Sequence, residues 1–413
     1  MSNEAPVPDK PYVTWDRDAK GALSGVRVLD LSRFIAGPLC AQNLGDLGAD
    51  VIKVEGLTGE DARANSPAIN GKALYTMMYN RNKRAITLNA RTDEGRALPR
   101  RLASWADVIV ENFRPGTLDK MGLDEESLRT LNPRVIVVSI SGFGQSGPYR
   151  DRVLFDCIAQ SMSGLMDMNA GPDGLPRLTK MFPADTAAAN QATSAALAAL
   201  FHRERTGQGQ TIDIAVLDSL VAALGTSLPA NLMFGLDPEH NGNRDDFNAP
   251  ANAFPVKDGH VYLHAGTAAF WARFTSDVLG RPELATDPRF DSTPARMSHI
   301  DEIEEIVSSW TKERTGLEVE RAFEAAGIPC ARVADVATAA RNEQLWHRDM
   351  LFRTHDSDGD ELYLMGHPAK FSASPVTMRY APPRLGEHTD EVMRDVIGLD
   401  EAEIARLHDA GVI

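Results

Sequence analysis

The chain has 413 residues, which is enough for two domains with a sizeable core. Hydrophobic residues make up 43% and charged residues 24%, as in an ordinary globular protein. The formal net charge of −15 disfavours a general nucleic-acid binder, because such a protein needs a basic surface. The net charge does not exclude a local basic pocket that binds a small anion.

The N-terminal stretch MSNEAPVPDKPYVTWD lacks the basic and apolar regions of a signal peptide. No apolar run reaches the length of a membrane span. The three cysteines, Cys40, Cys157 and Cys330, form neither a CxxC pair nor a zinc pattern. We therefore expect a cytoplasmic protein with reduced thiols, without a metal site and without a nucleic-acid or membrane partner.

Apolar runs of strand type alternate with helical patterns in the first half of the chain. The predicted strands are residues 26–31, 49–55, 83–88, 107–113, 134–144 and 211–217, and the predicted helices are 37–48, 92–106, 186–205 and a helix from 218. This alternation implies βαβ units and a parallel sheet, in which ligands bind beyond the carboxyl ends of the strands. The loops SRFIAGP, EGLTGED, ENFRPG and SISGFGQSGP are therefore expected to line a site.

The amino-acid composition changes near residue 228, where Asn, Asp, Gly and Pro become frequent. A hairpin edge is predicted at 257–265, helices across 268–325, a strand-like segment at 328–336 and a polar helix at 400–413. We expect an α/β fold in which a Rossmann-like large domain takes residues 1–227 and 331–413. A smaller α+β domain with its linker takes residues 228–330.

An alanine-rich helix is predicted directly after Asp185, in the stretch MFPADTAAANQATSAALAALFHRERT. One predicted stripe of this helix is buried: Ala189, Thr193, Leu197 and Phe201. Asp185 suits an N-cap, worth about 1 kcal/mol. The small residues around it also leave the space that a reactive group needs. The charge of the helix N-terminus would keep the carboxylate ionised, and an ionised, accessible Asp can act as a nucleophile.

Several ordered blocks carry a family resemblance over almost the whole chain. They include GVRVLDLSRFIAGPLCAQNLGDLGADVIKVE, NPRVIVVSISGFGQSGPYRDR and ADTAAANQATSAALAALFHRERTGQGQTIDIAVLDS. The chain resembles the class III coenzyme A transferases, which include formyl-CoA and carnitine-CoA transferases. The resemblance implies that Asp185 is a covalent nucleophile in reversible CoA transfer between two carboxylic acids, through an aspartyl-CoA thioester. It also implies an interlocked homodimer, with acyl-CoA as a substrate and no permanently bound cofactor. Backbone N–H groups near Asp185 are the expected oxyanion donors.

The resemblance also implies a set of CoA contacts. They are Phe34, Ile35, Ala36, Leu88, Arg91, Asn112, Phe113, Lys120, Met121 and Arg152. Lys83 and Arg84 are either phosphate neighbours or braces of a loop.

The chain also departs from the family pattern. Gly56 stands where the family often has Arg, so one phosphate contact is missing or supplied elsewhere. The glycine-rich loop of some formyl-CoA transferases is absent, which argues against a formyl or oxalate substrate. Three residues in the corresponding segment either read the second carboxylate of a dicarboxylate such as succinate or are plain loop polars: His240, Arg244 and Asn248.

Three alternative functions remain at this stage. The α-methylacyl-CoA racemases share the fold but need a His where this chain has Phe155. The next residue, Asp156, either positions substrate or caps the following helix. A dinucleotide-dependent dehydrogenase would need a GxGxxG turn after the first strand, which this sequence lacks. A non-catalytic CoA-binding protein would bind CoA equally well after Asp185→Ala.

Overall fold

The computed structural model describes residues 7–413. They group into two compact units, which we describe separately. The larger unit takes residues 8–166, 178–236 and 343–413, so three separate stretches of the chain build it. The smaller unit takes residues 167–177 and 237–342.

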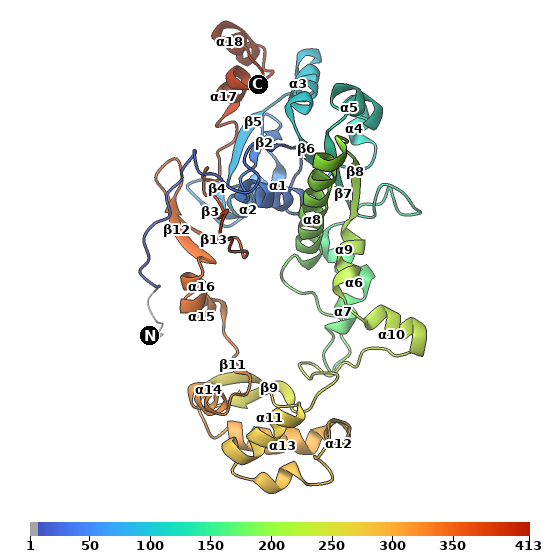
Figure 1. Cartoon of the computed structure of the whole chain (residues 1–413), viewed down its shortest axis with the longest axis vertical. Coiled ribbons are helices and arrows are strands. Elements are labelled where there is room, and N and C mark those ends of the chain that lie inside the picture. Colours follow the sequence, from blue (N-terminus) through green and yellow to red (C-terminus); the bar gives the residue numbers. More distant parts are fainter. Residues whose placement is uncertain (1–6) are drawn as a thin grey trace. The chain divides into compact units, whose positions relative to one another are not determined.

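A six-stranded sheet forms the centre of the larger unit, in the order β5-β2-β1-β6-β7-β8 (Figure 1). Its strands are β1 (Arg27–Asp30), β2 (Asp50–Glu55), β5 (Lys83–Thr87), β6 (Val108–Glu111), β7 (Ile136–Ser141) and β8 (Thr211–Ala215). All five pairings are parallel. The predicted α/β class and its parallel sheet are therefore confirmed.

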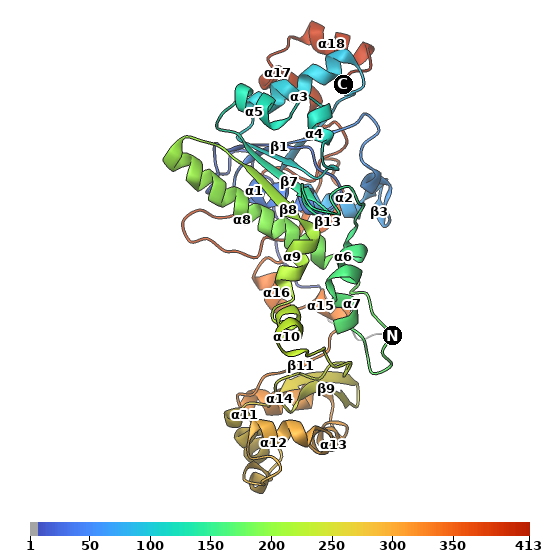
Figure 2. The same ribbon diagram turned by 90° about the vertical axis from the view of Figure 1, so that its right-hand side faces the viewer.

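Helices cover both faces of this sheet, because successive strand residues point to opposite sides. Val28 belongs to one core and its neighbour Leu29 to the other. The first face is covered by α1 (Ala36–Asp46), α8 (Pro183–Thr206) and α9 (Val216–Ala223). The second is covered by α3 (Asp93–Trp105), α5 (Glu125–Leu131), α17 (Thr389–Asp395) and α18 (Glu401–Asp409), as Figures 1 and 2 show.

Helix α8 packs on α1 and the sheet through alanines. Ala184, Ala188, Ala192 and Ala196 are fully buried. The predicted stripe is right for Ala189 and Thr193 but wrong at its end, because the Phe201 side chain is 64% exposed. Alanine leaves room for close contact between helix and sheet, so the small residues rather than the large ones mark the buried face.

The chain after the smaller unit returns to the first half of the larger one. A hairpin of β12 (Leu351–His355) and β13 (Glu361–Met365) packs on α2 (Leu74–Tyr79). Its turn carries Asp356, Asp358 and Asp360, whose carboxylates surround the Lys72 ammonium of β4 (Lys72–Ala73). That ammonium supplies the positive charge that three converging carboxylates need.

Helix α9 is followed by α10 (Ser227–Phe234) at a bend of 76°. None of the residues of α10 is buried. Among the described helices none alone has the length and apolar character of a membrane span, and this bent pair meets both criteria only when its two helices are taken together.

The smaller unit has a three-stranded antiparallel sheet of β9 (Ala251–Val256), β10 (Gly259–His264) and β11 (Cys330–Arg332). Its helices include α11 (Ala268–Arg273), α12 (Thr293–Ser298), α13 (Ile300–Thr311) and α14 (Gly316–Ala325). The predicted hairpin and the helical stretch after it are therefore confirmed. Trp271, Phe274, Phe290 and Phe323 form the aromatic part of its core.

Candidate active site

Asp185 lies in the first turn of α8 but does not cap it. The N-cap position is Phe182, and the cap comes from a different helix, α6 (Asp156–Ser163). The Asp156 carboxylate accepts the N–H groups of Ala184 at 2.8 Å and Asp185 at 3.2 Å. The prediction that Asp156 caps its own helix is wrong, because its carboxylate accepts N–H groups of α8 instead, and its role toward substrate stays a prediction. Because Asp156 supplies the cap, the Asp185 carboxylate makes no capping hydrogen bond.

The Asp185 carboxylate is half-buried, and no hydrogen-bond donor within residues 7–413 reaches it. Burial, followed by the negative charge of Asp156, raises the pKa of Asp185 from 3.8 to about 7. The helix terminus therefore does not keep this group fully ionised as predicted, because burial and the charge of Asp156 raise its pKa. At neutral pH the group is divided between acid and carboxylate, and the carboxylate is more basic than that of an ordinary Asp.

The expected oxyanion donors at the start of α8 are already engaged. Asp156 takes the N–H groups of residues 184 and 185, and the Thr186 N–H donates to the Phe182 carbonyl. Among the described residues the N–H groups of Ala184, Asp185 and Thr186 are therefore not free, and backbone oxyanion donors near Asp185 stay a prediction.

Aromatic side chains surround this part of the larger unit. The ring of Tyr75 on α2 meets Phe182 edge-on at 6.1 Å, and Phe34 meets Phe155 edge-on at 6.0 Å. Burial and then the charge of Asp185 raise the pKa values of Tyr75 and Tyr79. Both hydroxyls therefore stay protonated near Asp185 at neutral pH and keep their ability to donate a hydrogen bond.

A cavity of about 720 Å³ opens at the carboxyl ends of β1, β2, β5 and β6. Three of the four loops expected at this edge of the sheet contribute to it. Four predicted CoA contacts line it: Leu88, Arg91, Phe113 and Met121. Gly56 also lines it, with open space where a side chain would begin. The walls thus combine apolar side chains with charged groups of both signs.

The remaining predicted contacts do not line this cavity. Ile35 and Ala36 are buried at the start of α1. Lys120 is exposed at the end of α4 (Thr117–Lys120), and Arg152 lies over the rings of Phe143 and Tyr149. Phe34 belongs to the turn described next, and the Asn112 side chain binds the backbone of that turn at Arg33.

The two basic residues at the start of β5 are structural. The Lys83 ammonium is fully buried and contacts the Asp30 carboxylate, the Pro38 carbonyl and the Asn80 amide oxygen, each at 2.8 Å. Arg84 pairs with Asp50 at 2.6 Å. Of the two alternatives, phosphate neighbour or brace, the structure therefore supports the brace.

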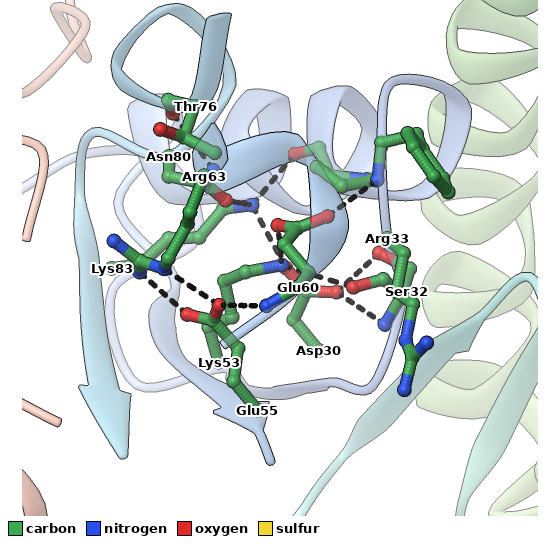
Figure 3. Close-up of polar contacts among 12 residues, drawn as sticks. Asp30, Ser32, Arg33, Lys53, Glu55, Glu60, Arg63, Thr76, Asn80 and Lys83 are labelled. Atoms are coloured by element: carbon green, nitrogen blue, oxygen red, sulfur yellow. Dashed lines mark hydrogen bonds and ion pairs between the residues drawn. The ribbon is translucent and has the colours of Figure 1, made fainter. Parts of the chain in front are cut away.

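The turn Ser32–Arg33–Phe34 after β1 is held by side chains from other segments, of which Figure 3 shows Lys53 and Glu60. The buried Lys53 ammonium donates to the Ser32 carbonyl at 2.9 Å and pairs with Glu60 at 3.1 Å. Glu60 in turn accepts the Phe34 N–H at 2.7 Å. Sequence reasoning missed both charged residues, although a lysine inside the apolar run VIKVE of β2 was a signal of a buried partner.

The loop residues considered for a second carboxylate are already paired within the smaller unit. Arg244 contacts Asp301 at 2.5 Å and Glu304 at 2.8 Å. His240 lies 3.2 Å from Asp167, and the Asn248 amide donates to Asp245 at 3.3 Å. These contacts support the alternative that His240, Arg244 and Asn248 are ordinary polar residues of a loop.

An open parallel sheet with a cavity beyond its strand ends defines an α/β protein that binds its ligand at the sheet edge. The model of CoA-transferase family III matches residues 23–389, so the chain belongs to this family and is a CoA-transferase enzyme that uses CoA thioesters. The resemblance seen in the sequence is therefore confirmed, and the racemase alternative is not favoured.

Individual relatives cover nearly the whole chain. The succinyl-CoA–D-citramalate CoA-transferase of Chloroflexus aurantiacus is 36% identical over 393 residues, which are 95% of this chain and 98% of that protein. The succinate–glutarate CoA-transferase of Agrobacterium fabrum is 37% identical over 385 residues, which are 91% and 96%. The crystal structure of a CAIB/BAIF family protein from Brucella suis matches with a TM-score of 0.82 at 35% identity, covering 91% of this chain and 100% of that one.

Proposed function

We propose that this enzyme moves CoA reversibly between a dicarboxylic acyl-CoA, such as succinyl-CoA, and a second carboxylic acid, through a thioester on Asp185. The observation that carries the proposal is the free carboxylate of Asp185 in the first turn of α8, whose capping task is performed by Asp156. Its raised pKa adds to the case, because a more basic carboxylate is a better nucleophile.

Each step of the proposed reaction forms one bond and breaks one. The Asp185 carboxylate oxygen forms a bond to the thioester carbonyl, and the carbon–sulfur bond breaks to give a mixed anhydride and CoA thiolate. The thiolate then attacks the aspartyl carbonyl, and the donor acid leaves with one oxygen that belonged to Asp185. The acceptor acid repeats both steps in reverse, so that Asp185 ends with an oxygen from the acceptor.

The acid pair is inferred from the relatives. Both named relatives act on succinyl-CoA or succinate together with another dicarboxylic acid. With Arg244 already paired to two carboxylates of its own unit, the second carboxylate of the substrate needs another partner. The protonated hydroxyls of Tyr75 and Tyr79 are suited to donate hydrogen bonds to that second carboxylate.

The test is intact-protein mass spectrometry after incubation with succinyl-CoA, glutaryl-CoA and acetyl-CoA. We expect a CoA-sized adduct on the wild type, mapped to Asp185, and none on Asp185→Ala. Turnover with carboxylate-¹⁸O succinate as acceptor should also place ¹⁸O in the Asp185 peptide. Exchange of solvent deuterium into the acyl α-position, without an adduct, would instead support the racemase chemistry.

We also propose that two copies of the chain form the working enzyme, in the cytoplasm. The homodimer is supported by the exposed apolar residues of α10 and the segment after it, where Leu232 is 85%, Met233 70% and Leu236 60% exposed. An exposed apolar run of this kind is typical of an interface. Sedimentation of the wild type should give twice the mass of one chain. The double variant Leu232→Glu and Met233→Glu should shift the measured mass toward that of one chain.

A further inference from the structure

The cavity at the sheet edge is lined by charges of both signs, but most of its carboxylates are already neutralised. Both oxygens of Glu55 are held by Arg63, at 2.7 and 2.6 Å. Glu60 is paired with the buried Lys53 behind the wall. An anionic ligand would therefore meet the two lining arginines, Arg33 and Arg91, and the single exposed carboxylate of Asp61.

The backbone of Arg33 is fixed on both sides. Its N–H donates to the Asn112 side-chain oxygen at 2.8 Å, and its carbonyl accepts the Asn112 amide at 2.7 Å. The preceding residue is held by Asp30 and Lys53, and the following one by Glu60. All three residues of the turn thus have backbone groups bound by side chains from other segments.

Two further features show that this turn is tightly packed and has a constrained backbone. Phe34 has a left-handed backbone with φ of 62°, which is uncommon for a residue with a side chain. A Cβ at Gly37 would lie 2.2 Å from the Ser32 Cβ, so only glycine lets α1 begin so near the turn. The turn therefore has little freedom to move, although its central side chain is exposed.

The Arg33 side chain takes no part in the network that holds its backbone. In the described part of the chain its guanidinium has no hydrogen-bond or ion-pair partner. Figure 3 shows it extending away from Glu60 and Lys53. A cation on a rigid backbone loses little freedom on binding, and guanidinium matches the geometry of phosphate oxygens.

We infer that Arg33 is a phosphate-binding residue of the coenzyme cavity. The inference rests on the proposed use of CoA at this site and assigns to Arg33 the contact that Gly56 cannot supply. The phosphate is either the 3′-phosphate or the diphosphate of CoA, since both present the same chemistry to an arginine.

The experiment measures CoA and 3′-dephospho-CoA binding by calorimetry for the wild type and Arg33→Gln. Arg205→Gln is the matched control, because Arg205 is also exposed but lies near the end of α8, over the Phe201 ring. We expect Arg33→Gln to weaken CoA binding by about tenfold, as for a lost charged hydrogen bond. A loss confined to CoA assigns the 3′-phosphate, and an equal loss for both ligands assigns the diphosphate. Unchanged binding of both ligands overturns the inference.

A second variant separates a lost contact from a disturbed fold. Position 56 lines the same cavity and has open space, so Gly56→Arg added to Arg33→Gln should recover part of the lost CoA affinity. A merely structural role of Arg33 predicts no recovery, and that result counts against the inference. Wild-type CoA binding without an Asp185 adduct would refute the covalent chemistry and still leave the Arg33 comparison decisive.

Discussion

Replacing Asp156 by asparagine tests what sets the pKa of Asp185. The asparagine oxygen can still accept the N–H groups of Ala184 and Asp185, now 2.8 and 3.2 Å from the carboxylate, but the negative charge is gone. Burial is the larger cause of the raised pKa and the charge of Asp156 the smaller one. The pKa should therefore fall from about 7 by less than half of its rise above 3.8. In single-turnover adduct formation with succinyl-CoA, the acidic limb of the pH–rate profile should move to lower pH.

Two further variants separate charge from capping. Asp156→Ala also removes the acceptor, and the lost cap should cost about 1 to 2 kcal/mol of stability in urea unfolding. Asp124→Asn is the matched control, because Asp124 caps α5 by accepting the Ser127 N–H at 2.9 Å and is not among the charges that act on Asp185. An acidic limb that stays in place in Asp156→Asn, or moves to higher pH, would refute the account.

Three more outcomes are expected. Asp185→Asn should stabilise the protein, because the raised folded-state pKa of Asp185 makes wild-type stability fall as pH rises from 3.8 to about 7. The gain in the free energy of unfolding should grow across that window to on the order of 3 kcal/mol. A gain in urea unfolding that does not depend on pH would contradict this expectation. Lys53→Met should cost about 3 to 5 kcal/mol by leaving Glu60 buried without its cation, and adding Glu60→Gln should recover much of the loss in a double-mutant cycle. Gly37→Ala should lower both thermal stability and CoA affinity, since its Cβ would meet Ser32 at 2.2 Å; normal values for both would show that α1 can shift freely.

The sheet could be predicted because its strands are short apolar runs with turn residues between them. Each predicted strand of the larger unit's first half has a counterpart in the central sheet. The edge that carries the cavity followed from the parallel topology alone. Local pattern was sufficient for these features because they depend on neighbouring residues.

The charged groups could not be placed in this way, because their partners are distant in sequence. Lys83 has the appearance of a surface residue until Asp30, 53 positions earlier, is found beside it. The cap of α8 comes from Asp156, 28 and 29 positions before the N–H groups it binds. The same holds for Asn112 and Arg33, which are 79 positions apart. The sequence led to Asp185 as the proposed nucleophile but not to the surroundings that set its pKa.

The three-stretch construction of the larger unit has a consequence for synthesis on the ribosome. Residues 343–413 are made after the smaller unit, yet His388 binds the β5 backbone at Ala85, and Val392 and Met393 lie in the core beneath the sheet. The part of this sheet face that α17 and α18 cover therefore stays open until the smaller unit between the stretches has been made, and non-local contacts of this kind slow folding. The smaller unit, whose core lies within residues 254–330, can fold first. A nascent chain stalled before residue 343 would hold a finished small unit beside an unfinished, aggregation-prone large one.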